Sequence, residues 1–201
     1  MEAVISKSER TRQLIVEKSA HLFNQKGFAG TSMQDIMVAT GLTKGGIYGH
    51  FDSKEEIALA AFEHATSYLI RLIADKLAAH TSALNKLAAL ISFYRTYLFT
   101  PPIIGGCPVL NTSVEADDTN PQLRVNVVKV LDKLHKAVAN IVKQGIEQGE
   151  FKATADAERF SVLFIIMVEG GIMVSKAYGD TKHMNIVLQH LEQIIEQELK
   201  V

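Results

Sequence analysis

The chain contains little proline, almost no cysteine and no tryptophan. Its 201 residues include four prolines and a single cysteine, Cys107. One cysteine cannot close an intrachain disulfide or supply a cysteine-based zinc cluster, so both kinds of site are excluded. The apolar residues make up 47% of the chain and recur at spacings of three and four rather than two, which favours helices over strands. The sequence therefore predicts an all-α fold with a substantial core.

Long apolar runs and targeting signals are also missing. The most apolar region, residues 160–174, is interrupted by Ser161, Glu169 and two glycines. It falls short of the ~20 residues that span a bilayer. No charged-then-apolar pattern of a secretory signal stands at the beginning of the sequence. We therefore expect a cytoplasmic protein without a membrane segment.

Signatures of catalysis are absent from the sequence. It contains no G-x-S-x-G, no H-E-x-x-H and no P-loop, and histidines and carboxylates are not paired at metal-ligand spacing. Gly45, Gly46 and Gly49 do not form a dinucleotide fingerprint, because no strand precedes them. The sequence predicts no catalytic site, no cofactor and no metal.

The most informative segment, residues 31–56, has the start and stop signals of two short helices. Ser32 has Asp35 three residues later, which is the pattern of a capping box. Gly41 suits the left-handed position that ends a helix, and Thr43 can cap the next one. Two short helices joined by a tight turn and followed by a longer helix form a helix-turn-helix with its supporting helix.

The second short helix has an apolar face and a polar face. Ile47 and Phe51 are expected to pack inward, which leaves Lys44, Tyr48 and His50 around the rest of the helix. A helix of this size and chemistry, held on a compact scaffold, can lie in the major groove of double-stranded DNA.

These features resemble the N-terminal region of the TetR (tetracycline-repressor-like) family of bacterial regulators. The resemblance covers roughly residues 8–58 and rests on Leu22-Phe23, Gly27-Phe28, Thr31-Ser32, Asp35-Ile36, Gly41 to Phe51 and Ser53 to Glu56. Met37 departs from the small alanine that is usual in the family, and Gly46 loosens the start of the second short helix. The resemblance implies that DNA is bound by Thr31, Ser32, Thr43, Lys44, Gly45, Gly46, Tyr48, His50 and Lys54.

The charge of this region gives only weak support to DNA binding. Residues 1–55 hold seven basic and six acidic side chains, and the net charge of the whole chain is −1. The placement of the cations flanking the motif favours DNA more than their number does. The low charge leaves an alternative open, a helical protein-protein adaptor that has lost DNA binding.

A first helix is expected from about Glu9 to Lys26, where Gly27 stops it. With this helix and the two short ones, the rest of the chain predicts six further helices, about nine in all. They cover residues 53–80, 82–98, a short segment after Pro108, 120–149, 156–178 and 181–199. We expect a DNA-binding domain at 1–52 and a helical regulatory and dimerisation domain at 53–201. The helix at 156–178 is apolar on all sides, so it lies at the centre of a domain or faces a second subunit. We favour a homodimer formed through the last two helices, with Val187 and Leu191 in the interface.

A pocket for a small-molecule effector is expected among the helices of the second domain. The candidate residues are Phe93, Tyr97, Cys107, Asn111, Phe164, Met167 and Glu169. Glu169 has two interpretations, a partner for a ligand amine or a member of an internal hydrogen bond. Cys107 also has two, a thiolate that senses oxidants or electrophiles at a helix start, or a small buried hydrophobe.

The sequence as a whole predicts a homodimeric transcriptional regulator of the TetR type. We expect a repressor that is released from a palindromic operator by a small molecule or by modification of Cys107. Palindromic sites require two motifs related by a two-fold axis, which agrees with the predicted homodimer.

Overall fold

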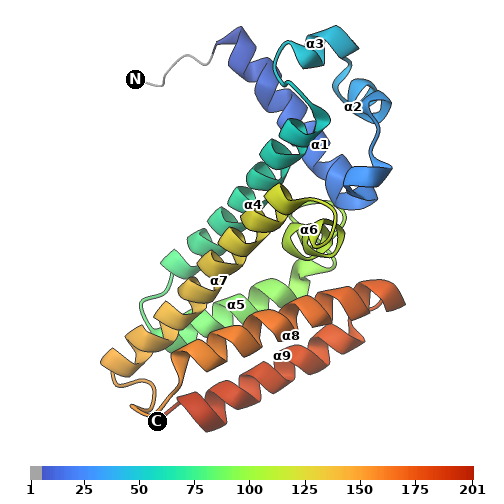
Figure 1. Ribbon diagram of the computed structural model, residues 1–201. Coiled ribbons are helices and arrows are strands. Elements are labelled where there is room, and N and C mark those ends of the chain that lie inside the picture. The colour runs from blue at the N-terminus through green and yellow to red at the C-terminus, as the bar shows by residue number, and fades with distance from the viewer. Residues whose placement is uncertain (1–5) are drawn as a thin grey trace. The chain divides into compact units, whose positions relative to one another are not determined.

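The computed structural model describes residues 6–201, so the first five residues of the predicted domain 1–52 lie outside it. The described residues form nine α-helices and a short π-helix, which confirms the all-α prediction (Figure 1). The helices are α1 Lys7–Gly30, α2 Met33–Thr40, α3 Lys44–Tyr48, α4 Lys54–Ala78, α5 Ala83–Tyr97, α6 Pro108–Ala116, α7 Pro121–Glu147, α8 Ala157–Tyr178, α9 Lys182–Ile194 and the π-helix Ile195–Leu199.

Contacts divide the chain into two compact units. Unit 1 comprises Met1–Tyr68 and Ile103–Asn126, and unit 2 comprises Leu69–Pro102 and Val127–Val201. Unit 1 therefore holds not only α1 to α3 but also the first part of α4, the loop before α6, and α6 itself. The domain boundary after residue 52 stays a prediction.

The core of unit 1 joins the first four helices. Its buried residues are Ile15, Val16, Ile36, Ile47, Phe51 and Ile57, which come from α1, α2, α3, the loop after α3 and α4. Ile47 and Phe51 are buried, as the apolar face of the second short helix predicted. Truncating a residue such as Ile47 to alanine would cost roughly 2–5 kcal/mol of folding free energy. The position of α3 is therefore fixed by the packing of its inner face.

Helix α1 is interrupted at Gly27, the residue at which the sequence predicted its end. Gly27 has φ 75° and ψ 171°, outside the helical region, and the chain resumes one more helical turn up to Gly30. The sequence predicted that the helix stops at Gly27. A residue with a side chain is strained at this φ, so glycine is required for the break.

Unit 2 packs α9 against α8 and α5, and Figure 1 shows α8 and α9 side by side. A Cβ at Gly171 of α8 would lie 2.8 Å from Met184 Sδ of α9, so glycine at this position allows the two helices to approach closely. The predicted all-round burial of α8 is not found within the chain. One face, with Phe164 and Ile172, is buried, whereas Ile166 and Met173 on the other face are exposed.

Helices α4 and α8 are long and apolar enough to cross a membrane, judged by length and composition alone. This is weak support for a membrane protein, because a core helix of a soluble protein passes the same test. About half of each apolar window is buried inside the protein already, at 44% for both.

Candidate nucleic-acid interface

Side-chain caps define where α2 and α3 begin and end. The hydroxyl of Ser32 accepts from the Asp35 N–H at 3.1 Å, while a carboxylate oxygen of Asp35 accepts from the Ser32 N–H at 2.8 Å. Gly41 ends α2 in the left-handed conformation, with φ 71°. Thr43 Oγ1 accepts from the Gly46 N–H at 3.1 Å and starts α3. The predicted capping box, helix stop and second cap are all confirmed.

The outer face of α3 carries two long side chains and, between them, two glycines whose backbone is exposed. Lys44 and Tyr48 are exposed, and the Lys44 Nζ lies 5.8 Å from the centre of the Tyr48 ring. Gly45 and Gly46 are exposed between them. A Cβ at Gly45 would meet nothing within 4 Å. A surface of this kind can approach another molecule closely and offers it an ammonium and a phenol.

His50 and Ser32 lie at the edges of this surface. Ser32 is exposed at the start of α2, and His50 is half-buried just after the end of α3. Arg12 of α1 is exposed, and its guanidinium lies 4.6 Å from the centre of the Phe51 ring. Packing on the ring holds this cation close to the end of α3.

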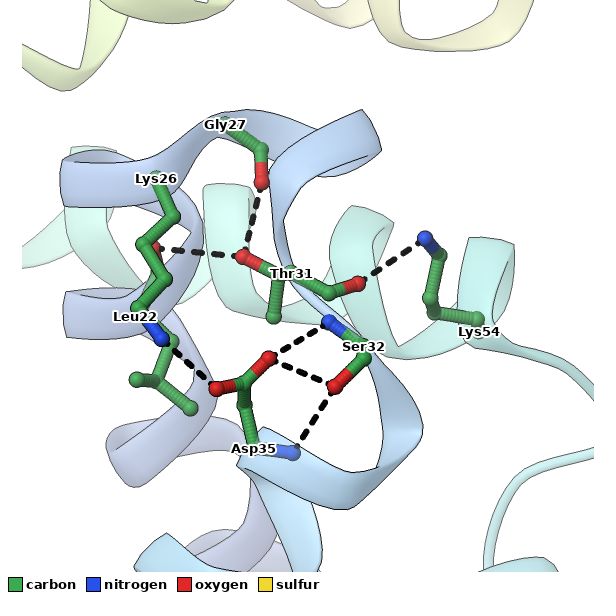
Figure 2. A network of polar contacts seen from close by, with 7 residues as sticks. All are labelled: Leu22, Lys26, Gly27, Thr31, Ser32, Asp35 and Lys54. Atoms are coloured by element: carbon green, nitrogen blue, oxygen red, sulfur yellow. Dashed lines mark hydrogen bonds and ion pairs between the residues drawn. The ribbon is translucent and has the colours of Figure 1, made fainter.

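Thr31 and Lys54 make contacts within unit 1 that the family resemblance did not imply. Thr31 is fully buried, and its hydroxyl donates to the Gly27 carbonyl at 2.7 Å (Figure 2). The Lys54 ammonium donates to the carbonyls of Phe28 and Thr31 at 2.8 and 3.0 Å. It also lies 4.1 Å from the centre of the Phe28 ring. Both residues hold the turn between α1 and α2 together, and the Thr31 side chain has no exposed surface to offer to DNA.

An ion pair joins the end of α1 to the first turn of α2. The Lys26 Nζ lies 2.6 Å from Asp35 Oδ1, as Figure 2 shows. The hydrogen bond from Lys26, together with those from the Ser32 side chain and backbone, holds the pKa of Asp35 well below its usual range. Asp35 is therefore ionised at neutral pH, and its charge is part of the cap of α2.

A second set of contacts, which the sequence did not predict, connects α1 to α6. The two carboxylate oxygens of Glu115 accept from the N–H groups of Phe28 and Ala29 at 2.6 and 2.8 Å. The Asn111 side chain donates to Asn24 and to the Gly105 carbonyl. Asn111, which we expected in the effector pocket, is thus occupied in a network within unit 1. Its partners lie up to 87 residues away in sequence, and no local pattern reveals them.

The remaining candidates for effector binding lie in both units. Phe93, Tyr97 and Phe164 are buried in unit 2, where the Phe93 and Tyr97 rings are 5.6 Å apart. Tyr94 bridges them to Phe164, at 6.1 Å between ring centres. Met167 and Glu169 are half-buried on α8. Cys107 is buried in unit 1, directly before α6.

A surface groove of about 430 Å³ lies in unit 2 at the end of α5 and the turn from α8 to α9. It is lined by Leu98, Phe99, Ser175, Lys176, Gly179, Asp180 and Thr181. Its volume is in the range of small-molecule sites, but none of the predicted effector residues lines it.

Comparison with known families finds two matches along the chain. Residues 15–61 match the family described as bacterial regulatory proteins, tetR family. Residues 83–191 match the family described as tetracyclin repressor-like, C-terminal domain. Together these segments include α2, α3 and most of the helices of unit 2.

Characterised relatives and solved structures agree with these matches. The HTH-type transcriptional repressor DhaR of Mycobacterium sp. (strain GP1) is 26% identical over 166 residues, 82% of each chain. The HTH-type transcriptional regulator LmrA of Bacillus subtilis is 26% identical and covers 94% of this chain and 97% of its own. A TetR transcriptional regulator from Chloroflexus aurantiacus superposes with a TM-score of 0.93 at 40% identity, over 97% of this chain and 98% of the other. A TetR-family regulator from Cytophaga hutchinsonii gives 0.92 at 35% identity, over 99% of both chains.

Proposed function

The chain belongs to the TetR family of bacterial regulatory proteins and is a DNA-binding transcriptional regulator, and we propose that it represses genes from a palindromic operator. The observation that carries the proposal is the outer face of α3, where Lys44 and Tyr48 flank the exposed backbone of Gly45 and Gly46. Members of the family are in general dimeric, cytoplasmic and not enzymes, and we extend this to the present chain.

In the proposed complex, α3 lies in the major groove and the caps of α2 and α3 face phosphates. Lys44 and Tyr48 contact the DNA directly, and Ser32, Thr43 and His50 lie at the edges of the contact surface. Gly45 and Gly46 let the α3 backbone approach the groove. Thr31 and Lys54 act indirectly, because their polar groups hold the turn that places α2.

We assign the dimer interface to the exposed apolar side chains of α8 and α9. Ile166, Met173 and Ile186 are 62%, 52% and 55% exposed, and exposed apolar side chains on two helices that pack together are suited to association with a second subunit. A Cβ at Gly170 would meet nothing within 4 Å, so a second helix has room beside it.

Of the two residues expected in this interface, Leu191 needs correction. Leu191 is fully buried within the chain, and Val187 packs against Gly171 of α8. A charge at Leu191 would therefore test the fold of unit 2 and not its association.

For the effector we propose an apolar or aromatic molecule that enters beside the aromatic cluster of α5 and α8. Phe93, Tyr97 and Phe164 supply ring surfaces, and Met167 and Glu169 lie on the same helix as Phe164. Asn111 no longer belongs to the proposed site. The burial of Cys107 favours its role as a small packed hydrophobe over that of an accessible thiolate.

Selection of genomic fragments tests this function without knowledge of the operator. Purified protein is mixed with sheared genomic DNA, and the retained fragments are sequenced and then used as duplexes in gel-shift titrations at several salt concentrations. A repressor enriches fragments with a two-fold symmetric sequence, and its affinity falls steeply with salt because phosphate contacts release counterions. An adaptor that has lost DNA binding enriches none.

A further inference from the structure

We propose that Glu115 of α6 is a positioning residue for DNA binding. Its carboxylate caps the last turn of α1, and docking of α6 through this contact holds α2 and α3 in the geometry that binds the operator. The proposal rests on the proposed function and adds the route by which α6 controls the same DNA-binding surface.

The turn after Gly27 needs an external partner for its N–H groups. Because the helix is broken at Gly27, the next N–H groups have no carbonyl one turn earlier to donate to. Glu115 supplies both oxygens of one carboxylate, to Phe28 at 2.6 Å and to Ala29 at 2.8 Å. A charged acceptor at the positive end of a helical turn makes stronger hydrogen bonds than a neutral one.

Gly27 makes room for this cap as well as for the break. A Cβ at residue 27 would lie 2.7 Å from both carboxylate oxygens of Glu115. The same glycine therefore gives the backbone its left-handed φ and leaves space for the carboxylate.

The opposite side of the turn is held by Lys54. Its ammonium binds the Phe28 and Thr31 carbonyls, so the turn is fixed at its N–H groups by α6 and at its carbonyls by α4. Only Thr31 and Ser32 separate the turn from the first residue of α2. A shift of the turn is therefore passed to α2, and through the shared core to α3.

A buried polar network fastens the rest of the α6 segment to α1. The Asn24 side chain donates to the carbonyls of Ile104 and Gly106, both at 3.0 Å. Asn111 donates to the Asn24 carbonyl at 2.9 Å. A Cβ at Gly105 would lie 2.6 Å from that same carbonyl oxygen. Undocking of the α6 segment would leave these polar groups without their partners, which favours one docked arrangement over partly docked ones. An element of this kind is one on which regulation can act.

The contacts between α1 and the α6 segment connect two parts of unit 1 and do not form the effector site. The cavity beside Glu115, Phe28 and Asn24 has a volume of about 30 Å³, enough for a water molecule but far below the size of a ligand pocket. The loop that carries the network follows α5 directly in the chain, and α5 contributes Phe93 and Tyr97 to the proposed effector site. An effector that displaces this loop would release the cap.

The test compares wild type with Glu115→Gln and Glu115→Asp, using full-length protein and the selected operator duplex. The amide keeps the shape but loses the charge and turns an N–H donor toward the turn, whereas aspartate keeps the charge but withdraws it by one methylene. Glu63→Gln is the control, because Glu63 is an exposed carboxylate of α4 and its loss changes the net charge equally.

We expect both Glu115 variants to lose operator affinity by at least about tenfold, while Glu63→Gln binds as wild type. Amide hydrogen exchange at Phe28 and Ala29 should accelerate in the same variants, with dimerisation unchanged. Wild-type affinity in both variants, or unchanged exchange at these two amides, would overturn the positioning role. Failure of wild type to bind any fragment would instead overturn the regulator function, and the exchange comparison would still decide whether the cap exists.

Discussion

Lys26 Nζ lies 2.6 Å from Asp35 Oδ1 and joins the end of α1 to the first turn of α2. The other oxygen of the Asp35 carboxylate accepts from both the N–H and the hydroxyl of Ser32. One carboxylate thus ties the first helix to the cap of the second.

This arrangement predicts that Asp35 stabilises the protein at neutral pH and not in acid. Its pKa is lowered in the folded state, so the unfolded chain takes up the proton more readily. The contribution is complete above the usual aspartate pKa of about 4 and is lost as pH falls below that value. Asp35→Asn should therefore lower the melting temperature at pH 7, with a difference from wild type that shrinks toward pH 3. Thermal unfolding followed by circular dichroism measures it, and an equal difference at both pH values would contradict this account of the cap.

Replacement of Gly45 by alanine should raise the stability of α3 and weaken operator binding. A Cβ there meets nothing, so Gly45→Ala should stabilise α3 by about 0.5–1 kcal/mol by removing the conformational freedom of glycine. If the α3 backbone lies against the DNA, the added methyl group should weaken operator binding. Ser67→Ala, at an exposed position of α4, is the control for helix stability alone. Tighter operator binding by Gly45→Ala would show that this backbone does not approach the groove.

The exposed face of α8 should control the oligomeric state. Ile166→Glu and Met173→Glu place a charge where the proposed interface excludes water, so each should yield a folded monomer. Light scattering coupled to gel filtration measures the mass, and Val125→Glu, on an equally exposed valine of α7, serves as the control. Leu191→Glu should instead lose helical content, because Leu191 is buried within the chain. A dimeric Ile166→Glu together with a dimeric Met173→Glu would move the interface elsewhere.

The features predicted correctly from the sequence are those decided by neighbouring residues. The caps at Ser32 and Thr43 and the stop at Gly41 involve partners within four positions, so residue type and spacing are sufficient. The burial of Ile47 and Phe51, four positions apart, follows from the helical period.

The features that the sequence did not predict depend on which way a side chain points or on partners far away in the sequence. Thr31 and Lys54 are polar residues in a DNA-binding motif, but their polar groups are satisfied by backbone carbonyls of the same unit. Glu115 accepts hydrogen bonds from residues 86 and 87 positions away. These bonds form only when α6 packs against α1. The apolar period of α9 did not tell which of its residues, Ile186 or Leu191, faces outward.

Operator affinity of Lys44→Ala and Tyr48→Phe, measured against salt concentration, tests the central claim most directly. Both residues lie on the outer face of α3, so each variant should bind the selected operator more weakly than wild type while melting at the same temperature. Lys44→Ala should also reduce the slope of log affinity against log salt by about one for each protomer, because one phosphate contact is lost. Lys136→Ala, an exposed lysine of α7, should leave both quantities unchanged. Wild-type affinity and wild-type slope in both Lys44→Ala and Tyr48→Phe would contradict the assignment of α3 as the DNA-reading helix.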